Sequence, residues 1–274
     1  MPAWFYNLHV IAALFLIYFV FGLIGLCGYI INRKYFKVGR TNTNTAASYA
    51  QQTGLTFGTL FIAFWIALNW QTLDNLNLDS EREAQSIINL YNSAQLIDNP
   101  QLREQTQIAV QYYLNSIINN EYKSLEQGKL SPDSAAKIRE LSSVIYTLPT
   151  TTLEEKTTYI QITTALNTLI QNRFDRLDYV EGQINGVLLV FFMMLLALIC
   201  FWGGFIYHRN GKLTIMSLFT QHLVILTSAW LILEIDRPFQ GYFKVDNYAF
   251  IKADYYLQHQ HTQQIKFPSG RPVK

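Results

Sequence analysis

Two polar side chains inside an apolar segment are the first candidates for chemistry in this sequence. Gln221 and His222 lie within "LTIMSLFTQHLVILTSAWLILEI", residues 213–235. Polar groups inside a membrane segment cost free energy, so such groups usually face a partner helix or an aqueous path. Histidine changes its charge near neutral pH, which suits a proton-sensitive or pore-facing group. The alternative interpretation is a hydrogen bond between helices that fixes their packing.

Three aromatic residues form a second candidate. Phe57, Phe61 and Trp65 recur at i, i+4 and i+8, so they lie on one face of a helix. If several copies turned this face toward a common axis, the rings would form an apolar constriction that gates by dewetting. The alternative is a stripe of aromatic residues packed against lipid or neighbouring helices.

The third candidate is the stretch "EIDRPFQGYFKV", which begins at Glu234 where an apolar run stops. Pro238 lacks a backbone donor and disfavours helix in the residue before it, so the apolar helix is expected to end there. Asp236 and Arg237 are then either solvated at the membrane edge, or Arg237 reaches an acid such as Glu83. If Arg237 reaches Glu83, Phe239 is expected to pack between the polar insert and the membrane helices, and Gly241 is expected to turn the chain.

Metal and cofactor chemistry finds little support in the sequence. Cys27 and Cys200 lie in apolar runs without ligand spacing, and His259 and His261 form only a weak pair on a polar tail. The polar region 74–183 has no histidine, no cysteine and no nucleotide-binding or hydrolase motif. We therefore expect no metal, no cofactor and no enzyme activity. The net charge of +2 also gives no reason to expect nucleic acid binding.

These candidates require elements that cross a membrane. Half of the chain is hydrophobic and 15% is charged, against about 25% charged residues in a typical soluble protein. Segments of about 20 apolar residues are long enough to span a bilayer. The sequence contains four of them, at residues 9–31, 55–73, 184–207 and 213–235.

The polar region between the second and third segments carries helix signals throughout. Ser80 with Glu83 has the pattern of a capping box, and Pro100 suits the first turn of a helix that stops near Gly128. Further start signals are Ser131 with Pro132, and Thr151 and Thr152, each with a glutamate three residues later. Residues 245–258 are expected to form a short amphipathic helix, opened by Asp246, that docks on this region or at the membrane surface.

The predicted fold is an all-α membrane protein, with four transmembrane helices and a helical bundle inserted between helices 2 and 3. The expected divisions are transmembrane helices 1 and 2 (1–73), a helical extramembrane domain (74–183), transmembrane helices 3 and 4 (184–235), and the motif with the C-terminal tail (236–274).

Loop charges predict the orientation. Cations without acids occur in the first loop and in the third loop, at Arg33, Lys34, Lys37 and Arg40, and at Arg209 and Lys212. Such loops stay in the cytoplasm. Residues 74–183 hold nine Lys/Arg and fifteen Asp/Glu, a net charge of −6. The helical domain and both termini are then expected in the periplasm, with the chain in the bacterial inner membrane.

This pattern resembles the bestrophin-like family of bacterial membrane proteins over nearly the whole chain. The resemblance rests on the four segments, the long helical insert, "REA" from residue 82, and "DRPFQG" from residue 236. Its motif residues here are Arg82, Glu83, Asp236, Arg237, Pro238, Phe239 and Gly241. True bestrophins are pentameric anion channels whose second helix carries three apolar neck residues, at the spacing of Phe57, Phe61 and Trp65.

The departures from bestrophins concern regulation and sidedness. Gln240 separates the Phe and Gly of the motif, and no acidic run follows Gly241, so the calcium clasp of animal bestrophins is not carried over. Bestrophins also keep their insert in the cytoplasm, opposite to the loop charges here.

We expect an oligomeric ion channel in the lipid bilayer, for anions and pentameric by the resemblance, with its constriction at Phe57, Phe61 and Trp65. The alternative is a non-conducting envelope scaffold or sensor whose helical domain binds a partner protein. Cationic loops at one mouth and an acidic insert at the other favour opposite ions, so charge alone does not choose.

Overall fold

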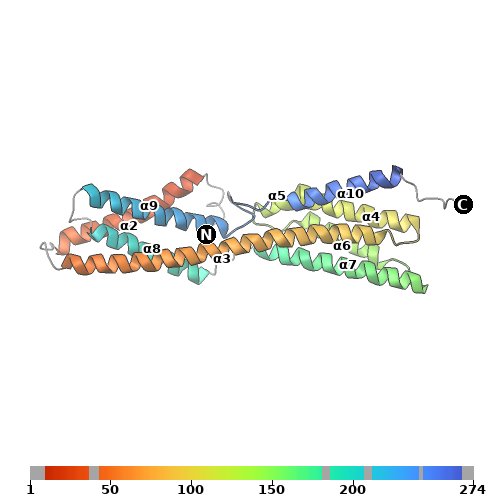
Figure 1. Ribbon diagram of the computed structural model, residues 1–274, viewed down its shortest axis with the longest axis horizontal. Coiled ribbons are helices and arrows are strands. Elements are labelled where there is room, and N and C mark those ends of the chain that lie inside the picture. Colours follow the sequence, from red (N-terminus) through yellow and green to blue (C-terminus); the bar gives the residue numbers. More distant parts are fainter. Residues whose placement is uncertain (1–9, 37–42, 181–185, 207–211, 241–242, 267–274) are drawn as a thin grey trace. The chain divides into compact units, whose positions relative to one another are not determined.

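The computed structural model describes residues 10–36, 43–180, 186–206, 212–240 and 243–266, and every regular element in these ranges is helical (Figure 1). This confirms the expectation of an all-helical protein. The chain divides into two compact units. The apolar unit comprises Met1–Thr72 and Gly182–Phe243, and the polar unit comprises Leu73–Glu181 and Lys244–Lys274.

The apolar unit is built from α2 (Val10–Ile31), the first part of α3 (Thr43–Ala94), α8 (Gly186–Ile206) and α9 (Lys212–Ile235). Among the described residues, three helical stretches are long and apolar enough to cross a membrane: Ala12–Tyr35, Gln51–Ala94 and Gly186–Phe205. In α9 the apolar stretch is shorter, Phe219–Ile235. The prediction of a fourth span there stays a prediction.

Helices α2 and α8 approach so closely that their backbones touch. A Cβ atom added to Gly28 would overlap the carbonyl oxygen of Phe201, and one added to Gly204 would overlap the carbonyl oxygen of Gly25. Only glycine fits at such a contact, and small residues commonly mediate close helix packing in membranes. Gly25, Gly28 and Gly204 are therefore the residues that allow α2 and α8 to pack closely.

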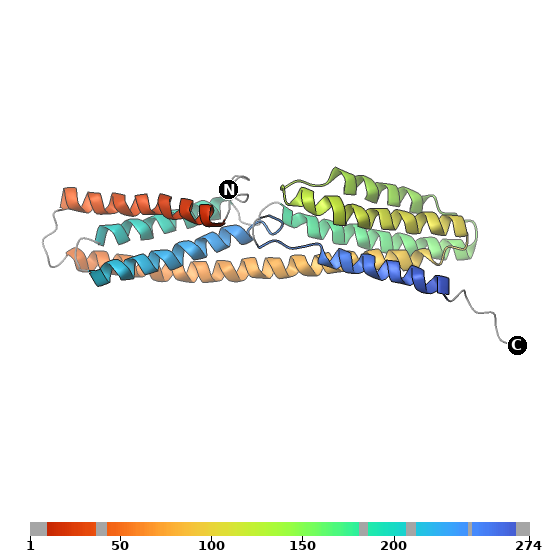
Figure 2. The same cartoon turned by 90° about the horizontal axis from the view of Figure 1, so that it is seen from above.

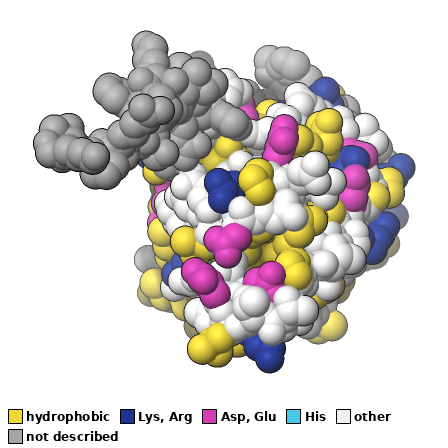
Figure 3. Space-filling model, turned by 90° about the vertical axis from the view of Figure 1, so that its right-hand side faces the viewer, with side chains coloured by type: hydrophobic (Ala, Val, Ile, Leu, Met, Phe, Trp, Pro, Cys, Tyr) yellow, Lys and Arg dark blue, Asp and Glu magenta, His cyan; other side chains and the backbone are white. Residues whose placement is uncertain are grey.

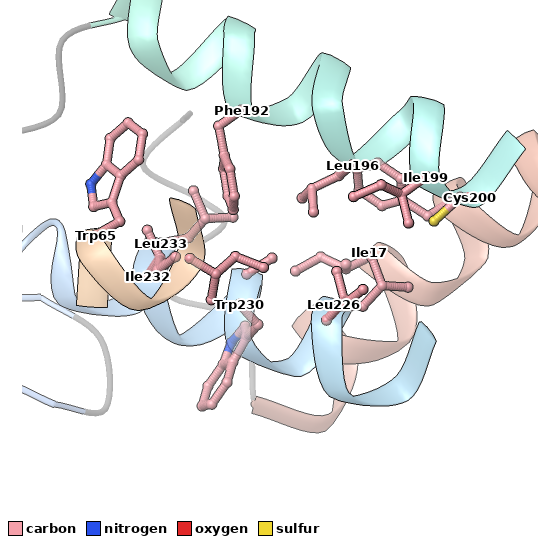
Figure 4. Close-up of a cluster of buried hydrophobic side chains, with 14 of the residues drawn as sticks. Ile17, Trp65, Phe192, Leu196, Ile199, Cys200, Leu226, Trp230, Ile232 and Leu233 are labelled. Carbon is pink, nitrogen blue, oxygen red and sulfur yellow. The ribbon is translucent and has the colours of Figure 1, made fainter. Parts of the chain in front are cut away.

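A common apolar core joins the four helices of this unit (Figure 4). It includes Ile17 of α2, Trp65 of α3, Phe192 of α8 and Leu226 of α9. Backbone carbonyls near the C-terminal half of α9 accept hydrogen bonds from its neighbours. The Tyr18 hydroxyl donates to the Leu223 oxygen at 2.8 Å, and the buried Asn69 amide donates to the Ile232 oxygen at 3.3 Å. Asn69 is thus an interhelical hydrogen-bonding residue.

The polar unit contains the second part of α3 and a set of shorter helices (Figures 1 and 2). These are α4 (Pro100–Ser116), the π-helix η2 (Ile117–Glu121), α5 (Tyr122–Leu125), α6 (Pro132–Tyr146), α7 (Leu153–Leu177), the 3-10 turn η3 (Asp178–Val180) and α10 (Tyr248–Lys266).

Three of the predicted helix starts in the polar unit are confirmed. The Asn99 side chain caps α4 ahead of Pro100, and the Ser131 hydroxyl caps α6. Thr152 and Glu155 form a reciprocal capping box at the start of α7. The α4–η2–α5 run ends at Leu125 and is followed by a turn to Gly128, whose φ of 70° is the left-handed conformation that glycine adopts without strain.

The predicted helix start at Ser80 is wrong, because α3 continues without a break to Ala94. The Ser80 hydroxyl instead donates to the Leu76 carbonyl oxygen, one turn earlier in the same helix, at 2.8 Å. No proline or glycine occurs between Gly58 and Pro100. A capping pattern alone does not end a helix whose backbone hydrogen bonds can all continue.

Helix α10 docks on the polar unit, as predicted for the amphipathic tail. Its buried face is Phe250, Ala253 and Leu257. The Phe250 ring lies 6.0 Å from the Tyr122 ring, and Asn247 donates to the Ile118 carbonyl oxygen at 3.2 Å. These contacts fix α10 beside α4 and η2 (Figure 1).

The surface charge of the polar unit is mixed. Figure 3 shows acidic, basic and hydrophobic side chains interspersed on the face it presents. The net charge of −6 over residues 74–183 therefore does not produce a field of a single sign on that face.

Candidate functional site

The aromatic stripe predicted on α3 turns from the surface toward the interior of its own unit. Phe57 is 70% exposed, Phe61 is half-buried and Trp65 is only 7% exposed. The Phe61 ring lies 4.9 Å from the Trp65 ring and 5.8 Å from the Phe192 ring. Trp65 itself packs against Phe192 at 5.6 Å (Figure 4). Phe61 and Trp65 thus contribute to the contact of α3 with α8.

Another set on α3 has the same spacing and remains on the surface. Leu60, Phe64 and Leu68 recur at i, i+4 and i+8 and are 66%, 62% and 44% exposed. The opposite face of α3 is buried at Ile62 and Asn69. Sequence reasoning missed this set, because the spacing alone fits several overlapping stripes on an apolar helix and does not show which one faces away from the core.

His222 lies between helices and is half-buried, whereas Gln221 is exposed. The imidazole ring of His222 fits against Gly203 of α8. A Cβ at Gly203 would lie 2.8 Å from the His222 Nε2 atom and 3.4 Å from the Nε2 atom of Gln51. Gln51 is 8% exposed, so α3, α8 and α9 bring a buried polar group and an imidazole together. This geometry supports a packing role for His222, and its proton-sensing role stays a prediction.

The stretch after α9 folds as a buried turn. Helix α9 ends at Ile235, as expected from Pro238. The Gln240 backbone N–H donates to the Arg237 carbonyl oxygen at 2.9 Å, and the Arg237 guanidinium donates to the Gln240 side-chain oxygen at 3.4 Å. Asp236, Phe239 and Gln240 are all buried, at 9% exposed or less. Gly241 lies outside the described residues.

Glu83 is the centre of a buried ion network in the polar unit. Its carboxylate pairs with Arg176 of α7, with Nε and Oε2 2.5 Å apart, and both side chains are fully buried. The Tyr113 hydroxyl donates to the other Glu83 oxygen at 2.6 Å. The neighbouring motif residue Arg82 is largely exposed and pairs with Asp79 at 2.9 Å. Arg82 and Glu83 of the "REA" motif therefore have different roles.

A second carboxylate completes the network. Glu121, the last residue of the π-helix η2, pairs with Arg173 at 2.8 Å and with Arg176 at 3.3 Å. Two arginines thus face two glutamates, so the cluster carries no net charge. The Arg176 guanidinium also lies 5.2 Å from the Phe250 ring centre, which ties α10 to the same cluster.

The network shifts the pKa values of its members. Burial by itself lowers the pKa of Arg176, but the carboxylates of Glu83 and Glu121 outweigh burial, and the pKa lies well above its ordinary value. Burial raises the pKa of Tyr113 well above its ordinary value, and the charge of Glu83 adds to this. The arginine is therefore charged and the tyrosine neutral at physiological pH.

Sequence reasoning missed Glu121, Arg173 and Arg176. One signal could have revealed the arginines. Ile162, Leu166 and Leu169 form the buried stripe of α7, and Arg173 and Arg176 continue this stripe at helical spacing. The pairing of Arg237 with Glu83 would join the two units and stays a prediction.

Metal-ligand groupings are absent from the described residues: no group of three His, Cys, Asp or Glu side chains there is arranged to hold an ion. His259 lies against Tyr255, with its Nδ1 atom 2.8 Å from the Tyr255 carbonyl oxygen. The structure does not describe the side chain of His261.

The apolar helices and the helical unit with its buried ion network define an all-α membrane protein. Residues 14–250 match the family model of the Bestrophin-like domain, so the chain belongs to the bestrophin-like family. None of the curated proteins compared with it matches.

The fold is similar to that of a bacterial bestrophin homologue from Klebsiella pneumoniae, solved by crystallography with one substitution. The TM-score is 0.64 at 13% sequence identity, over 89% of this chain and 99% of the other. The family resemblance of the sequence is therefore confirmed, and at this identity the structural match shows the shared fold.

Proposed function

We propose that this protein is an oligomeric ion channel in which α3 of each copy lines the pore. The observation that carries this proposal is the uncovered apolar face of α3, formed by Leu60, Phe64 and Leu68, in a chain of the bestrophin-like family. Within the described part of the chain these three side chains stay largely exposed, although the opposite side of the helix is packed. The likeness to a bacterial bestrophin homologue supports the same function.

The proposed topology has four transmembrane helices, with the polar unit inserted between the second and the third. Helix α9 has 24 residues, and at 1.5 Å per residue it is about 36 Å long, enough to cross the hydrocarbon core of about 30 Å. Helices α2, α8 and α9 would then pack behind α3 in each copy, on the side away from the pore axis. The family resemblance implies a pentamer.

The proposed constriction keeps Phe57 from the aromatic stripe. Its other residues are the exposed side chains of α3, in place of Phe61 and Trp65. Leu60, Phe64 and Leu68 would face the axis, and a ring of such side chains excludes water when the pore is narrow. Trp65 and Phe61 would support this wall from behind through their contacts with Phe192.

Recording from the purified protein in planar bilayers tests the proposal. Replacing Leu60, Phe64 and Leu68 together by alanine should widen the constriction and raise the conductance or open probability several-fold. The control is Leu198→Ala, which is 50% exposed, within the range of the three substituted residues, but lies on α8. Currents unchanged by the triple substitution would contradict the pore assignment. Oligomers that never conduct would favour a non-conducting scaffold that binds an envelope partner.

The resemblance favours anions as the conducted ions. Reversal potentials in a potassium chloride gradient separate anion from cation selectivity, since the two shift in opposite directions. A reversal potential near that of potassium would contradict anion selectivity.

The proposed orientation follows the loop charges, with the polar unit in the periplasm of a bacterium and the first loop in the cytoplasm. With both native cysteines replaced, Lys129→Cys in the polar unit should react with a membrane-impermeant maleimide in intact spheroplasts. Lys34→Cys in the first loop should react only after lysis. The reverse pattern would place the polar unit in the cytoplasm.

A further inference from the structure

A groove runs along the surface of the polar unit between α3 and α7. Its volume is about 530 Å³. Its lining is uncharged and consists mostly of short side chains: Ser86, Asn89, Thr157, Gln161, Thr164 and Thr168, with Ala165 and Ile160. Ile160 is 64% exposed. The groove is therefore an accessible, neutral surface into which large side chains fit.

The same unit carries a protruding face of complementary kind on α10. Tyr248, Ile251 and Tyr255 are 67%, 48% and 63% exposed and lie along one side of the helix. The opposite side of α10, at Phe250, Ala253 and Leu257, is buried against the unit itself. Figure 1 shows α10 and α7 at opposite edges of the polar unit, so one copy cannot bring the two surfaces together.

We propose that the exposed face of α10 in one copy seats in the α3–α7 groove of the next copy. Opposite edges of one unit that match each other generate a head-to-tail contact, which closes into a ring when the rotation between copies allows. This inference rests on the proposed oligomeric channel and assigns the surfaces that hold its polar units together.

Size and chemistry agree with this pairing. Tyr248 to Tyr255 extends over seven residues, about 10 Å of helix, and the groove from Thr157 to Thr168 extends over eleven, about 16 Å. Tyrosine places its ring on apolar surface while its hydroxyl bonds to polar groups. Ile160 offers the apolar surface, and the Thr, Asn and Gln side chains offer the partners. No charged side chain lines the groove. On α10 the exposed Lys252 lies beside Ile251 on the same side of the helix, and its long side chain would keep the ammonium group in water at the edge of the groove.

Disulfide crosslinking of the full-length protein tests the contact. With Cys27 and Cys200 replaced by alanine, the pair Ile251→Cys with Thr164→Cys should give disulfide-linked multimers on mild oxidation, because bridged residues have Cα atoms about 4.4–6.8 Å apart. A second pair, Tyr255→Cys with Gln161→Cys, should do the same. Each cysteine alone should give none.

The matched control pairs Ile251→Cys with Arg139→Cys on the exposed side of α6, and it should remain monomeric on the gel. If native mass spectrometry shows intact oligomers but neither pair crosslinks, the α10 contact is wrong and the oligomeric channel stands. If the unmodified protein is monomeric throughout, both proposals fail.

Discussion

Replacing Arg176 by methionine is expected to destabilise the polar unit by about 3–5 kcal/mol, the usual effect of removing one partner from a buried ion pair. Methionine keeps an unbranched apolar chain but lacks the guanidinium group, so its charge, its hydrogen bonds and its contact with the Phe250 ring are all removed. It leaves Glu83 and Glu121 buried with a single arginine between them. Two carboxylates in a medium of low polarity cannot both stay ionised without cost.

Hydrogen exchange of the full-length protein provides the measurement. Amides of α7 and of the second part of α3 should lose protection together, whereas amides of α2 and α8 in the apolar unit should change little. The control is Lys137→Met, which breaks a partly exposed pair with Glu140 on α6 and should leave exchange unchanged.

A double variant separates loss of charge balance from loss of packing. Adding Glu83→Gln to Arg176→Met removes the uncompensated carboxylate, so the double variant should be more stable than the sum of the two single effects implies. Simple additivity would show that the pair is not energetically coupled. The Arg176→Met variant behaving like the unmodified protein would contradict the assigned network.

Replacing Gly204 by alanine is expected to separate α2 from α8 and to destabilise the apolar unit by about 3 kcal/mol, the upper end of the usual cost of overpacking. The added Cβ would overlap the carbonyl group of Gly25, which is backbone and cannot rotate away. Alanine favours helix over glycine by about 1 kcal/mol, which offsets only part of this loss.

Gly22→Ala on α2 is the matched control, because a Cβ there meets nothing within 4 Å. Thermal unfolding in detergent should show Gly204→Ala melting well below the unmodified protein and Gly22→Ala at or above it. Gly28→Ala should resemble Gly204→Ala, since its Cβ would overlap the Phe201 carbonyl oxygen. Equal melting of all three variants would contradict the close approach of the two helices.

Signals that act within one helix could be read from the sequence. The starts of α4, α6 and α7 depend on a side chain and an amide at most three residues apart, as at Ser131 and Thr152. The apolar length of α2 and α8 likewise follows from composition alone. The family resemblance added the fold, because the residues of "REA" and "DRPFQG" lie at the expected places in the chain.

Choices between faces and partners required the tertiary structure. The spacing of Trp65 fitted either a pore stripe or packing against neighbouring helices, and only the structure shows that Trp65 packs on Phe192 while Leu60, Phe64 and Leu68 remain exposed. Glu83 meets Arg176, which lies 93 residues later in the chain.

The sequence by itself determined that this protein is a helical membrane protein with a helical polar region, because helix capping and apolar length are local properties. Only the tertiary structure decided which apolar face of α3 stays bare and which charges are buried together. Those outcomes depend on contacts between distant segments, and the spacing within one segment is compatible with several of them.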